Sequence, residues 1–249
     1  MNLCIDQGNS RTKVAIFDAD GKVVNDWMFR SKDFHAADVE KIFKFNSNIT
    51  SSIISSVINI DPSVVNTLNR LSKHFVLFDS TTQIPIANHY ATPNTLGQDR
   101  MAAAVGACEL LPDKNLLVID IGSAVTYDYV SATDGFMGGN IAPGLKMRLR
   151  ALRYFTGKLP KVETTENELI PLFGDNTRDA MAAGVINGLC FEIKGYMQEL
   201  KERIGDFSVV LTGGNANYFR SRLPNNIVFE RRLVLIGLNR ILNDIVNRL

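Results

Sequence analysis

The sequence contains few cysteines, and they form no recognisable pattern. Its 249 residues include three, Cys4, Cys108 and Cys190, which lie far apart among apolar neighbours. A zinc site needs closely spaced pairs such as Cys-x-x-Cys, and a disulfide framework needs an even set in a small secreted domain. We therefore expect three reduced, buried side chains, which excludes a disulfide-rich or zinc-bound protein.

An excess of charge is missing, and so are long apolar runs. Lys and Arg number 27 and Asp and Glu number 26, so the formal net charge is +1. Proteins that bind nucleic acids or anionic membranes usually display a basic field, so neither is an expected partner. No apolar run reaches the roughly 20 residues that cross a bilayer, and the N-terminal residues do not resemble a signal peptide. We expect a cytoplasmic protein.

A short motif occurs twice in the chain. DQGNSRT begins at Asp6 and DIGSAVT at Asp120; in both, Gly follows the Asp by two positions and Thr follows that Gly by four. Each copy lies between β-prone runs. The composition, 45% hydrophobic and 21% charged, supports buried cores, and the length suits two domains. We infer a duplicated domain, with one copy in residues 1–112 and the other in 113–249.

Helices and strands alternate in each half. Apolar spacing predicts helices at 32–45, 62–73, 99–111, 176–204 and 233–246, and strands at 51–57, 75–78 and 208–212. In the longest helix, apolar residues recur every three or four positions from Met181 to Ile204 and form one face. Gly184 and Gly188 lie one turn apart on another side, where they suit close packing within the chain or against a second copy. The alternation predicts an α/β fold with a mixed sheet.

The hairpin that starts at Asp6 suits a nucleoside triphosphate. Gly8 lets the backbone approach phosphate oxygens, because it carries no Cβ. Asp6 can hold Mg²⁺ through water ligands, because Mg²⁺ keeps part of its hydration shell. An ordinary solvated hairpin is the alternative, but the second copy at Asp120 favours two hairpins that face each other and grip the phosphates. The other polar groups suited to phosphate contact are Asn9, Ser10, Thr12 and Lys13.

Two further segments carry candidate functions. Residues 209–215 run from an apolar strand into a Gly-Gly pair, which allows close approach of an adenosine group; a tight strand-to-helix turn is the alternative. In residues 96–100, Asp99 begins a helix near the positive end of its dipole and can act as the base that takes a proton from an alcohol. Arg100 can bind an acidic substrate group. The alternative is a helix-capping Asp beside a surface Arg.

Taken in order, these segments resemble type III pantothenate kinase. The motifs are DQGNS at 6–10 with Lys13, GQDR at 97–100, DIGSA at 120–124 with Thr126, GGNIAPG at 138–144, Asn176-Thr177 before Asp179-Ala180, and Thr212-Gly213-Gly214. Each is weak alone, but six in order over nearly the whole chain are specific. The resemblance implies two ribonuclease H-like domains of the acetate and sugar kinase, Hsp70 and actin superfold, with ATP in the cleft between them.

The resemblance also implies the chemistry. It implies ATP-dependent phosphorylation of pantothenate to 4′-phosphopantothenate, the first step of coenzyme A biosynthesis. It further implies a homodimer that uses a divalent metal and a monovalent cation, K⁺ or NH₄⁺. We therefore expect ATP, Mg²⁺ and a monovalent cation as cofactors, and pantothenate and a second copy of the chain as partners.

Matching the motifs position by position implies roles for single residues. Asp99 would be the general base, Asp120 would bind the monovalent cation, and Asp6 would hold Mg²⁺ through water. The residues implied to bind ATP are Asp6, Gln7, Gly8, Asn9, Ser10, Arg11, Thr12, Lys13 and Ser123. Those implied to bind pantothenate are Tyr90, Gly97, Gln98, Asp99, Arg100 and Thr177, the last of which the partner subunit can supply.

Two positions depart from the family pattern, and two other functions share part of it. Ser123 stands where Thr is usual and keeps the hydroxyl, whereas Asn215 stands where Asp is usual and removes a charge near the adenosine end. A sugar or acetate kinase of the same superfold would lack the segment at 97–100. A nucleotide-binding accessory protein would have no need of Asp99. The presence of both features favours the pantothenate kinase.

Overall fold

The computed structural model describes residues 1–165 and 168–249, which pack into two compact units. The first unit comprises 1–114, 130–138 and 232–249, and the second comprises 115–129 and 139–231. The C-terminal helix therefore packs with the N-terminal half of the chain. The predicted division into domains near residue 112 stays a prediction, because compact packing and duplication of a domain are different criteria.

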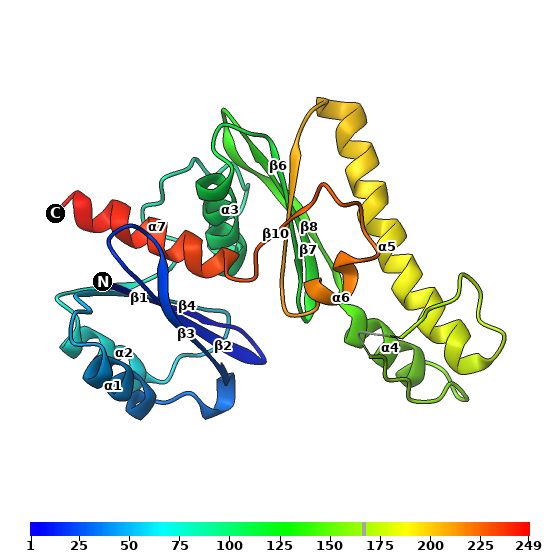
Figure 1. Cartoon of the computed structure of the whole chain (residues 1–249), viewed down its shortest axis with the longest axis horizontal. Coiled ribbons are helices and arrows are strands. Elements are labelled where there is room, and N and C mark those ends of the chain that lie inside the picture. Colours follow the sequence, from blue (N-terminus) through cyan, green and yellow to red (C-terminus); the bar gives the residue numbers. More distant parts are fainter. Residues whose placement is uncertain (166–167) are drawn as a thin grey trace. The chain divides into compact units, whose positions relative to one another are not determined.

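The first unit is built on a mixed sheet. Its strands are β1 (Asn2–Gln7), β2 (Arg11–Phe17), β3 (Val23–Arg30), β4 (Ser51–Ser56) and β5 (His74–Leu77), in the spatial order β3-β2-β1-β4-β5. The first three form an antiparallel meander, whereas β4 and β5 run parallel to β1. Parallel neighbours need crossover connections, and helices α1 (Ala36–Phe45) and α2 (Pro62–Leu71) supply them (Figure 1).

The two faces of this sheet are covered by different helices. Alternate residues of a strand point to opposite faces, and one face, with Leu3 and Ile5 of β1, packs in a hydrophobic core with Val39 and Ile42 of α1 and with Val64 of α2. The other face is covered by α3 (Gln98–Leu110) and α7 (Leu233–Asn247). The side chain of Asn2 fixes α7 to β1, because its Nδ2 donates to the side-chain oxygens of Asn239 at 2.8 Å and Asn243 at 2.7 Å.

Helices α3 and α7 cross at two glycines. A Cβ on Gly237 would lie 1.8 Å from the carbonyl oxygen of Ala102, and one on Gly106 would lie 2.2 Å from that of Leu233. The two backbones are therefore in direct contact, which only glycine allows at both positions. This crossing ties the helix that begins near Asp99 to the end of the chain.

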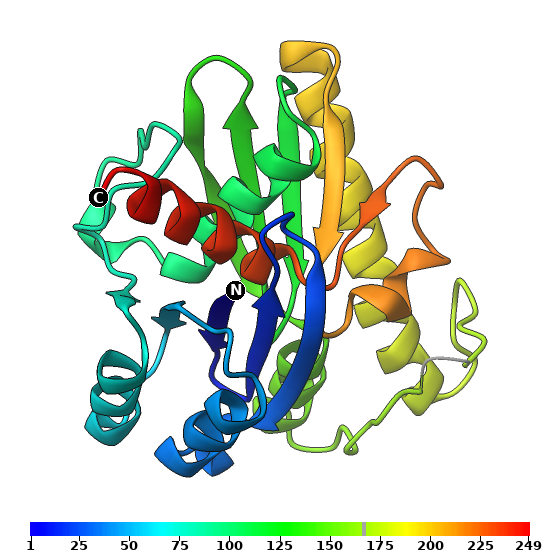
Figure 2. The ribbon, with the colours of Figure 1, turned by 60° about the vertical axis from the view of Figure 1, so that its left-hand side comes forward.

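The second sheet repeats the order of the first. Its strands are β6 (Leu116–Ile121), β7 (Ala124–Ser131), β8 (Gly135–Pro143), β9 (Ser208–Thr212) and β10 (Val228–Phe229). Read as β8-β7-β6-β9-β10, their spatial order matches that of the first sheet strand for strand, and β9 and β10 again belong to parallel pairs (Figure 2). The predicted repeat of strand, glycine turn and strand is confirmed, and so is the α/β fold with mixed sheets.

Three helices accompany the second sheet: α4 (Leu145–Tyr154), α5 (Thr177–Ile204) and α6 (Ala216–Arg220). The predicted apolar face of α5 is confirmed, because Met181, Val185, Leu189 and Ile193 lie in the hydrophobic core of this unit. Helix α4 was not predicted. Its sequence is rich in basic residues, and of the helically spaced Leu145, Leu149 and Leu152 only the first two are buried.

Most predicted boundaries agree with the structure, and one differs for a local reason. The helix predicted from residue 32 begins at Ala36, because Ser31–Asp33 form a 3-10 turn. A capping box then starts α1, in which the Asp38 carboxylate accepts from the backbone N–H of His35 at 3.0 Å. A second 3-10 turn spans Pro93–Thr95. The three cysteines are free, as predicted; Cys4 and Cys190 are buried, whereas Cys108, also predicted to be buried, is only partly so. Within the described ranges, no helix combines the length and the apolar character that crossing a membrane requires.

Candidate active site

The first glycine turn is closed by backbone hydrogen bonds and braced by a serine outside the motif. The N–H of Gly8 donates to the carbonyl oxygen of Arg11 at 3.0 Å. Ser31, just after β3, donates its hydroxyl to the carbonyl oxygen of Gly8 at 2.6 Å and its N–H to that of Ser10 at 3.3 Å. The buried Thr12 hydroxyl donates to Ser31 Oγ at 3.3 Å. Motif spacing did not reveal Ser31, because its contact depends on the pairing of β2 with β3.

The predicted phosphate-binding residues of this turn differ in accessibility. Asn9, Ser10 and Arg11 are exposed, whereas Gln7 and Thr12 are buried. The side-chain oxygen of Gln7 accepts from Ser56 Oγ at 3.2 Å. The exposed side chains and the backbone N–H groups at the tip can therefore reach a ligand directly, while the two buried side chains shape the turn.

Asp99 lies at the start of α3, in a setting that suits a base. Burial raises the pKa of Asp99 above the usual aspartate value, and the N–H and positive charge of Arg100, followed by the charge of Lys13, lower it by smaller amounts. The N–H of Arg100 donates to Asp99 Oδ1 at 2.9 Å. A Cβ on Gly97 would lie 2.5 Å from the same oxygen, so glycine leaves the carboxylate in this position and a larger residue would displace it.

Lys13 connects this helix with the first glycine turn. Its positive charge acts on Asp99, and its partner across the β1–β2 pair is Asp6. Paired residues of neighbouring strands point to the same face of a sheet. The structure thus brings together Asp6, Lys13 and Asp99, which the sequence places in two separate motifs.

Arg100 lies beside two aromatic rings that contact each other, with centroids 6.2 Å apart. Its guanidinium lies 5.6 Å from the ring centroid of Tyr90 and 5.9 Å from that of Phe136, and the residue is only 6% exposed. Cation–π contacts hold a guanidinium in place without neutralising its charge. The predicted neighbours Tyr90 and Arg100 are therefore in contact, and Phe136 is an additional member that lies outside the family motifs.

The second glycine turn is packed against two other glycine segments of its unit. The N–H of Gly122 donates to the carbonyl oxygen of Ala124 at 2.9 Å, and that of Gly144 donates to the carbonyl oxygen of Ser123 at 3.2 Å. A Cβ on Gly144 would lie 2.3 Å from that Ser123 oxygen, and one on Gly213, which has φ +103°, would lie 2.4 Å from Asp120 Oδ1. Three motifs far apart in sequence therefore meet around Asp120.

Asn215 makes a contact that the usual aspartate cannot make. Its side-chain Nδ2 donates to the carbonyl oxygen of Gly122 at 3.1 Å, and its N–H donates to the carbonyl oxygen of Ile121 at 2.9 Å. A carboxylate has no proton to donate at neutral pH and would be repelled by the carbonyl dipole. Through these two hydrogen bonds, Asn215 connects the end of β6, which carries Asp120, with the Gly213-Gly214 turn.

A partly buried network behind the second turn was missed by the sequence analysis. Arg148 of α4 donates from Nε to the carbonyl oxygen of Pro143 at 2.6 Å and from Nη2 to Glu192 of α5 at 2.7 Å. The Tyr127 hydroxyl donates to the other oxygen of Glu192 at 2.7 Å. Because Gly144 follows Pro143 directly, this network positions the segment that contacts Ser123. No sequence motif indicates it, since its members come from three separate elements.

Thr177 begins α5 and is exposed. The capping side chain of Asn176 accepts from the N–H of Asp179 at 3.0 Å, which fixes the first turn of the helix. Thr177 lies at a mainly apolar cavity of about 840 Å³ between α4 and α5, which Leu152, Phe155 and Met181 also line. The structure places this residue, Asp120 and Ser123 in the second unit, whereas the remaining predicted site residues belong to the first.

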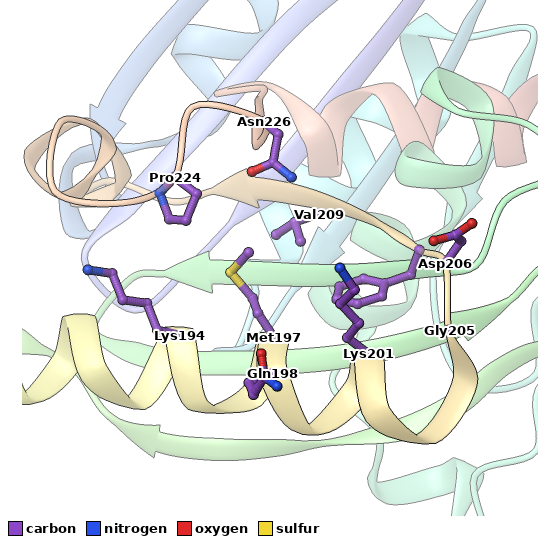
Figure 3. Close-up of a pocket in the computed structure, with 10 residues that line it drawn as sticks. Lys194, Met197, Gln198, Lys201, Gly205, Asp206, Val209, Pro224 and Asn226 are labelled. Atoms are coloured by element: carbon purple, nitrogen blue, oxygen red, sulfur yellow. The ribbon is translucent and has the colours of Figure 1, made fainter.

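Another cavity of the second unit, of about 430 Å³, lies between α5 and the loop before β10. Figure 3 shows Lys194, Met197 and Lys201 along the helix, with Pro224 and Asn226 on the loop opposite. No residue predicted to bind ATP or pantothenate lines it, so this cavity supports no part of the predicted site.

The metal-binding side chains of the described residues do not suit an ion bound by protein ligands alone. Within residues 1–165 and 168–249, no group of three or more His, Cys, Asp or Glu side chains is placed to hold a metal ion. A single carboxylate such as Asp6 fits a cation that keeps most of its water, as Mg²⁺ does.

Comparisons with known sequences identify one family, and comparisons with solved structures show the fold. The family model for type III pantothenate kinase matches residues 2–199. The type III pantothenate kinase of Phocaeicola vulgatus is 42% identical over 243 residues, covering 98% of each chain. Among solved structures, a Baf family protein of Campylobacter jejuni superposes with a TM-score of 0.63 at 20% identity, covering 98% of this chain and 99% of the other. A protein of Cytophaga hutchinsonii, described as a candidate sugar kinase, gives 0.51 at 14%, covering 99% of each.

Proposed function

This chain belongs to the type III pantothenate kinase family and phosphorylates pantothenate with ATP in coenzyme A biosynthesis, and we propose that Asp99 is the base of this reaction. The observation that carries the proposal is the position of Asp99 at the start of α3, where burial raises its pKa and Lys13 and Arg100 are close enough to act on it. A carboxylate with a raised pKa accepts a proton more readily from the attacking hydroxyl. The neighbouring positive charges suit an anionic substrate and an anionic transition state.

The first turn is proposed to bind the phosphates of ATP. Backbone N–H groups and the exposed side chains of Asn9, Ser10 and Arg11 donate to phosphate oxygens, and Lys13 adds charge. Gln7, Gly8 and Thr12 keep the turn in shape from beneath. Asp6 would orient the water ligands of Mg²⁺, and that ion, when bound, would offset the negative charge of the transferring phosphoryl group.

The second turn is proposed to hold the monovalent cation and to contact ATP through Ser123. Support comes from Thr212, the partner of Asp120 across the β6–β9 pair. Its buried hydroxyl makes no hydrogen bond to any described residue. A carboxylate and a hydroxyl on one face are oxygen donors of the kind that K⁺ binds, so these residues fit the ion.

The substrate side is proposed to consist of Tyr90, Gly97, Gln98, Arg100 and Thr177. Pantothenate carries a carboxylate, and the guanidinium of Arg100, held beside the rings of Tyr90 and Phe136, is a suitable partner for it. Gly97 leaves the backbone open beside Asp99. Thr177 lies at the apolar cavity of the second unit, and the Thr177 that contacts pantothenate is proposed to come from the partner subunit.

A homodimer through α4 and α5 is proposed from exposed apolar surface. Phe155 and Phe173 are 80% and 85% exposed, which is unusual for large apolar side chains of a monomer. A Cβ added to Gly184 or Gly188 would meet no described atom within 4 Å, so these glycines do not serve packing within the described chain. We expect Phe155→Glu to yield monomers in light scattering. Phe45→Glu, at an equally exposed position of the first unit (79%), should leave the dimer intact.

The decisive test of the activity is ATP-dependent phosphorylation by purified protein in K⁺ and Mg²⁺. Pantothenate, glucose, glycerol and acetate are offered in parallel, and product only from pantothenate is expected. ATP binding without product would instead favour a nucleotide-binding accessory protein. Replacement of K⁺ or NH₄⁺ by Na⁺ should lower the rate sharply, and equal rates in the three salts would remove the cation from the proposal.

A cytoplasmic location is proposed as well. The three unpaired cysteines of the protein and its need for ATP support this location.

A further inference from the structure

Ser55 on β4 differs from Ser52 and Ser56 of the same strand. It is fully buried, and its hydroxyl makes no hydrogen bond to any described residue. The hydroxyl of Ser52 pairs with that of Ser72 at 2.6 Å, and the hydroxyl of Ser56 donates to the carbonyl oxygen of Ile58 at 2.8 Å. The unpaired hydroxyl is therefore a property of this position and not of the strand as a whole.

A buried hydroxyl that finds no partner lowers stability. The desolvation cost of such a group is about 1–3 kcal/mol, and an alanine of nearly the same volume would avoid it. A hydroxyl at this position is therefore explained best by a polar ligand that the folded protein binds there.

The position of Ser55 indicates which ligand that is. In the parallel pairing of β1 with β4, Ser55 lies opposite Asp6, and on the other side of β1 Lys13 lies opposite the same Asp6. The three residues form one row across the sheet, on the face that carries Asn2 and that α3 and α7 cover. The charge of Lys13 acts on Asp99, so the row belongs to the catalytic face of the first unit.

The second sheet repeats this arrangement. Asp120 pairs with Thr212 in the same relation as Asp6 with Ser55, and the Thr212 hydroxyl is likewise buried and makes no hydrogen bond to a described residue. Aligned on this hydroxyl, the strands β4 (SSIISS) and β9 (SVVLT) share the apolar residues before it and a serine at the first position. In both copies, a buried hydroxyl lies on the neighbouring strand directly opposite the turn aspartate. This repetition indicates that the role of the hydroxyl is linked to the aspartate.

We propose that Ser55 is a positioning residue for the divalent cation of the kinase. A water in the hydration shell of that cation would donate one hydrogen bond to the Ser55 hydroxyl oxygen and another to the Asp6 carboxylate. Water bound to a divalent cation is a strong proton donor, so two acceptors on one face fix its orientation. The inference rests on the proposed use of Mg²⁺ at Asp6 and adds the second group that orients its water.

The test uses cation affinity as well as activity. Mn²⁺ serves as a paramagnetic probe, and its binding to the full-length protein with a non-hydrolysable ATP analogue is followed by electron paramagnetic resonance. Ser55→Ala should weaken Mn²⁺ binding by about 10–100-fold, the usual effect of removing a group that orients a metal ligand. Its melting temperature should stay the same or rise, because the variant removes an unpaired buried hydroxyl.

Two further variants separate this role from a structural one. Ser55→Thr keeps a hydroxyl, as Thr212 does in the second copy, and should retain Mn²⁺ affinity. Ser52→Ala lies on the opposite face and removes the partner of Ser72, so it should lower the melting temperature and leave Mn²⁺ affinity unchanged.

Each outcome of these measurements decides a separate point. Wild-type Mn²⁺ affinity in Ser55→Ala would overturn the inference, and a lowered melting temperature with it would show that Ser55 only holds a structural water. Tight Mn²⁺ binding by the wild-type protein without phosphorylation of pantothenate would instead refute the proposed function. In that case, weaker Mn²⁺ binding by Ser55→Ala would still support the role of Ser55 in cation binding.

Discussion

Replacement of Asp99 by Asn tests the proposed base most directly, because it changes the charge and little else. The side-chain oxygen that accepts from the N–H of Arg100 at 2.9 Å is retained in asparagine, and the volume is nearly unchanged. Loss of a general base typically lowers the rate about 10²–10⁴-fold. At about 1.36 kcal/mol per factor of ten, this corresponds to about 2.7–5.4 kcal/mol of transition-state stabilisation.

The same substitution, which lowers the rate, is expected to maintain or raise the stability of the fold. Burial raises the pKa of Asp99 in the folded protein, whereas in the unfolded chain the carboxyl titrates near about 3.9. Between these two pKa values the native state binds more protons than the unfolded state, so the free energy of unfolding falls as the pH rises through this window. At neutral pH the Asn variant is therefore expected to be at least as stable as the wild type.

The assay combines steady-state turnover, binding of a fluorescent ATP analogue and thermal melting. We expect kcat to fall by at least 100-fold, while ATP affinity and the melting temperature are maintained. Asp61→Asn is the matched control, because Asp61 caps α2 by accepting from the N–H of Ser63 and asparagine caps equally well. Turnover of Asp99→Asn within tenfold of the wild type would refute the assignment of the base.

Three further predictions concern other parts of the molecule. Because the raised pKa belongs to the base, kcat/KM should decline on acidification at a pH above about 3.9, the value of a solvated aspartate; a rate still on its plateau at that pH would contradict the raised pKa. Thr212→Val should raise the K⁺ concentration for half-maximal activity about tenfold, and an unchanged K⁺ dependence would exclude Thr212 as a ligand. Gly237→Ala places a Cβ 1.8 Å from the Ala102 carbonyl oxygen, so it should lower the free energy of unfolding by about 1–3 kcal/mol or more in a denaturant titration; full stability would show that the α3–α7 crossing adapts easily.

The repeated motif was the strongest source of information in the sequence about the fold. A strand, a glycine turn and a second strand are local features, and the matching copies at Asp6 and Asp120 predicted the repeated sheet that the structure has. Helix α5 was also predictable, because a long apolar face needs only regular spacing to be recognised. Helix α4 was missed, because apolar and basic residues alternate from Leu145 to Arg150 and obscure the helical spacing of its leucines.

The sequence by itself determined the family, the repeated α/β sheets and the residue types of the site, because each depends on short segments in a fixed order. Only the tertiary structure decided which of them meet. The pairing of β1 with β2 and with β4 places Lys13 and Ser55 on either side of Asp6, and the crossing of α3 with α7 supports the helix of Asp99. Arg148, Glu192 and Ser31 likewise gained their roles from contacts between elements that lie far apart in the chain. Such contacts arise from strand register and close packing, which the spacing of residues along one chain does not encode.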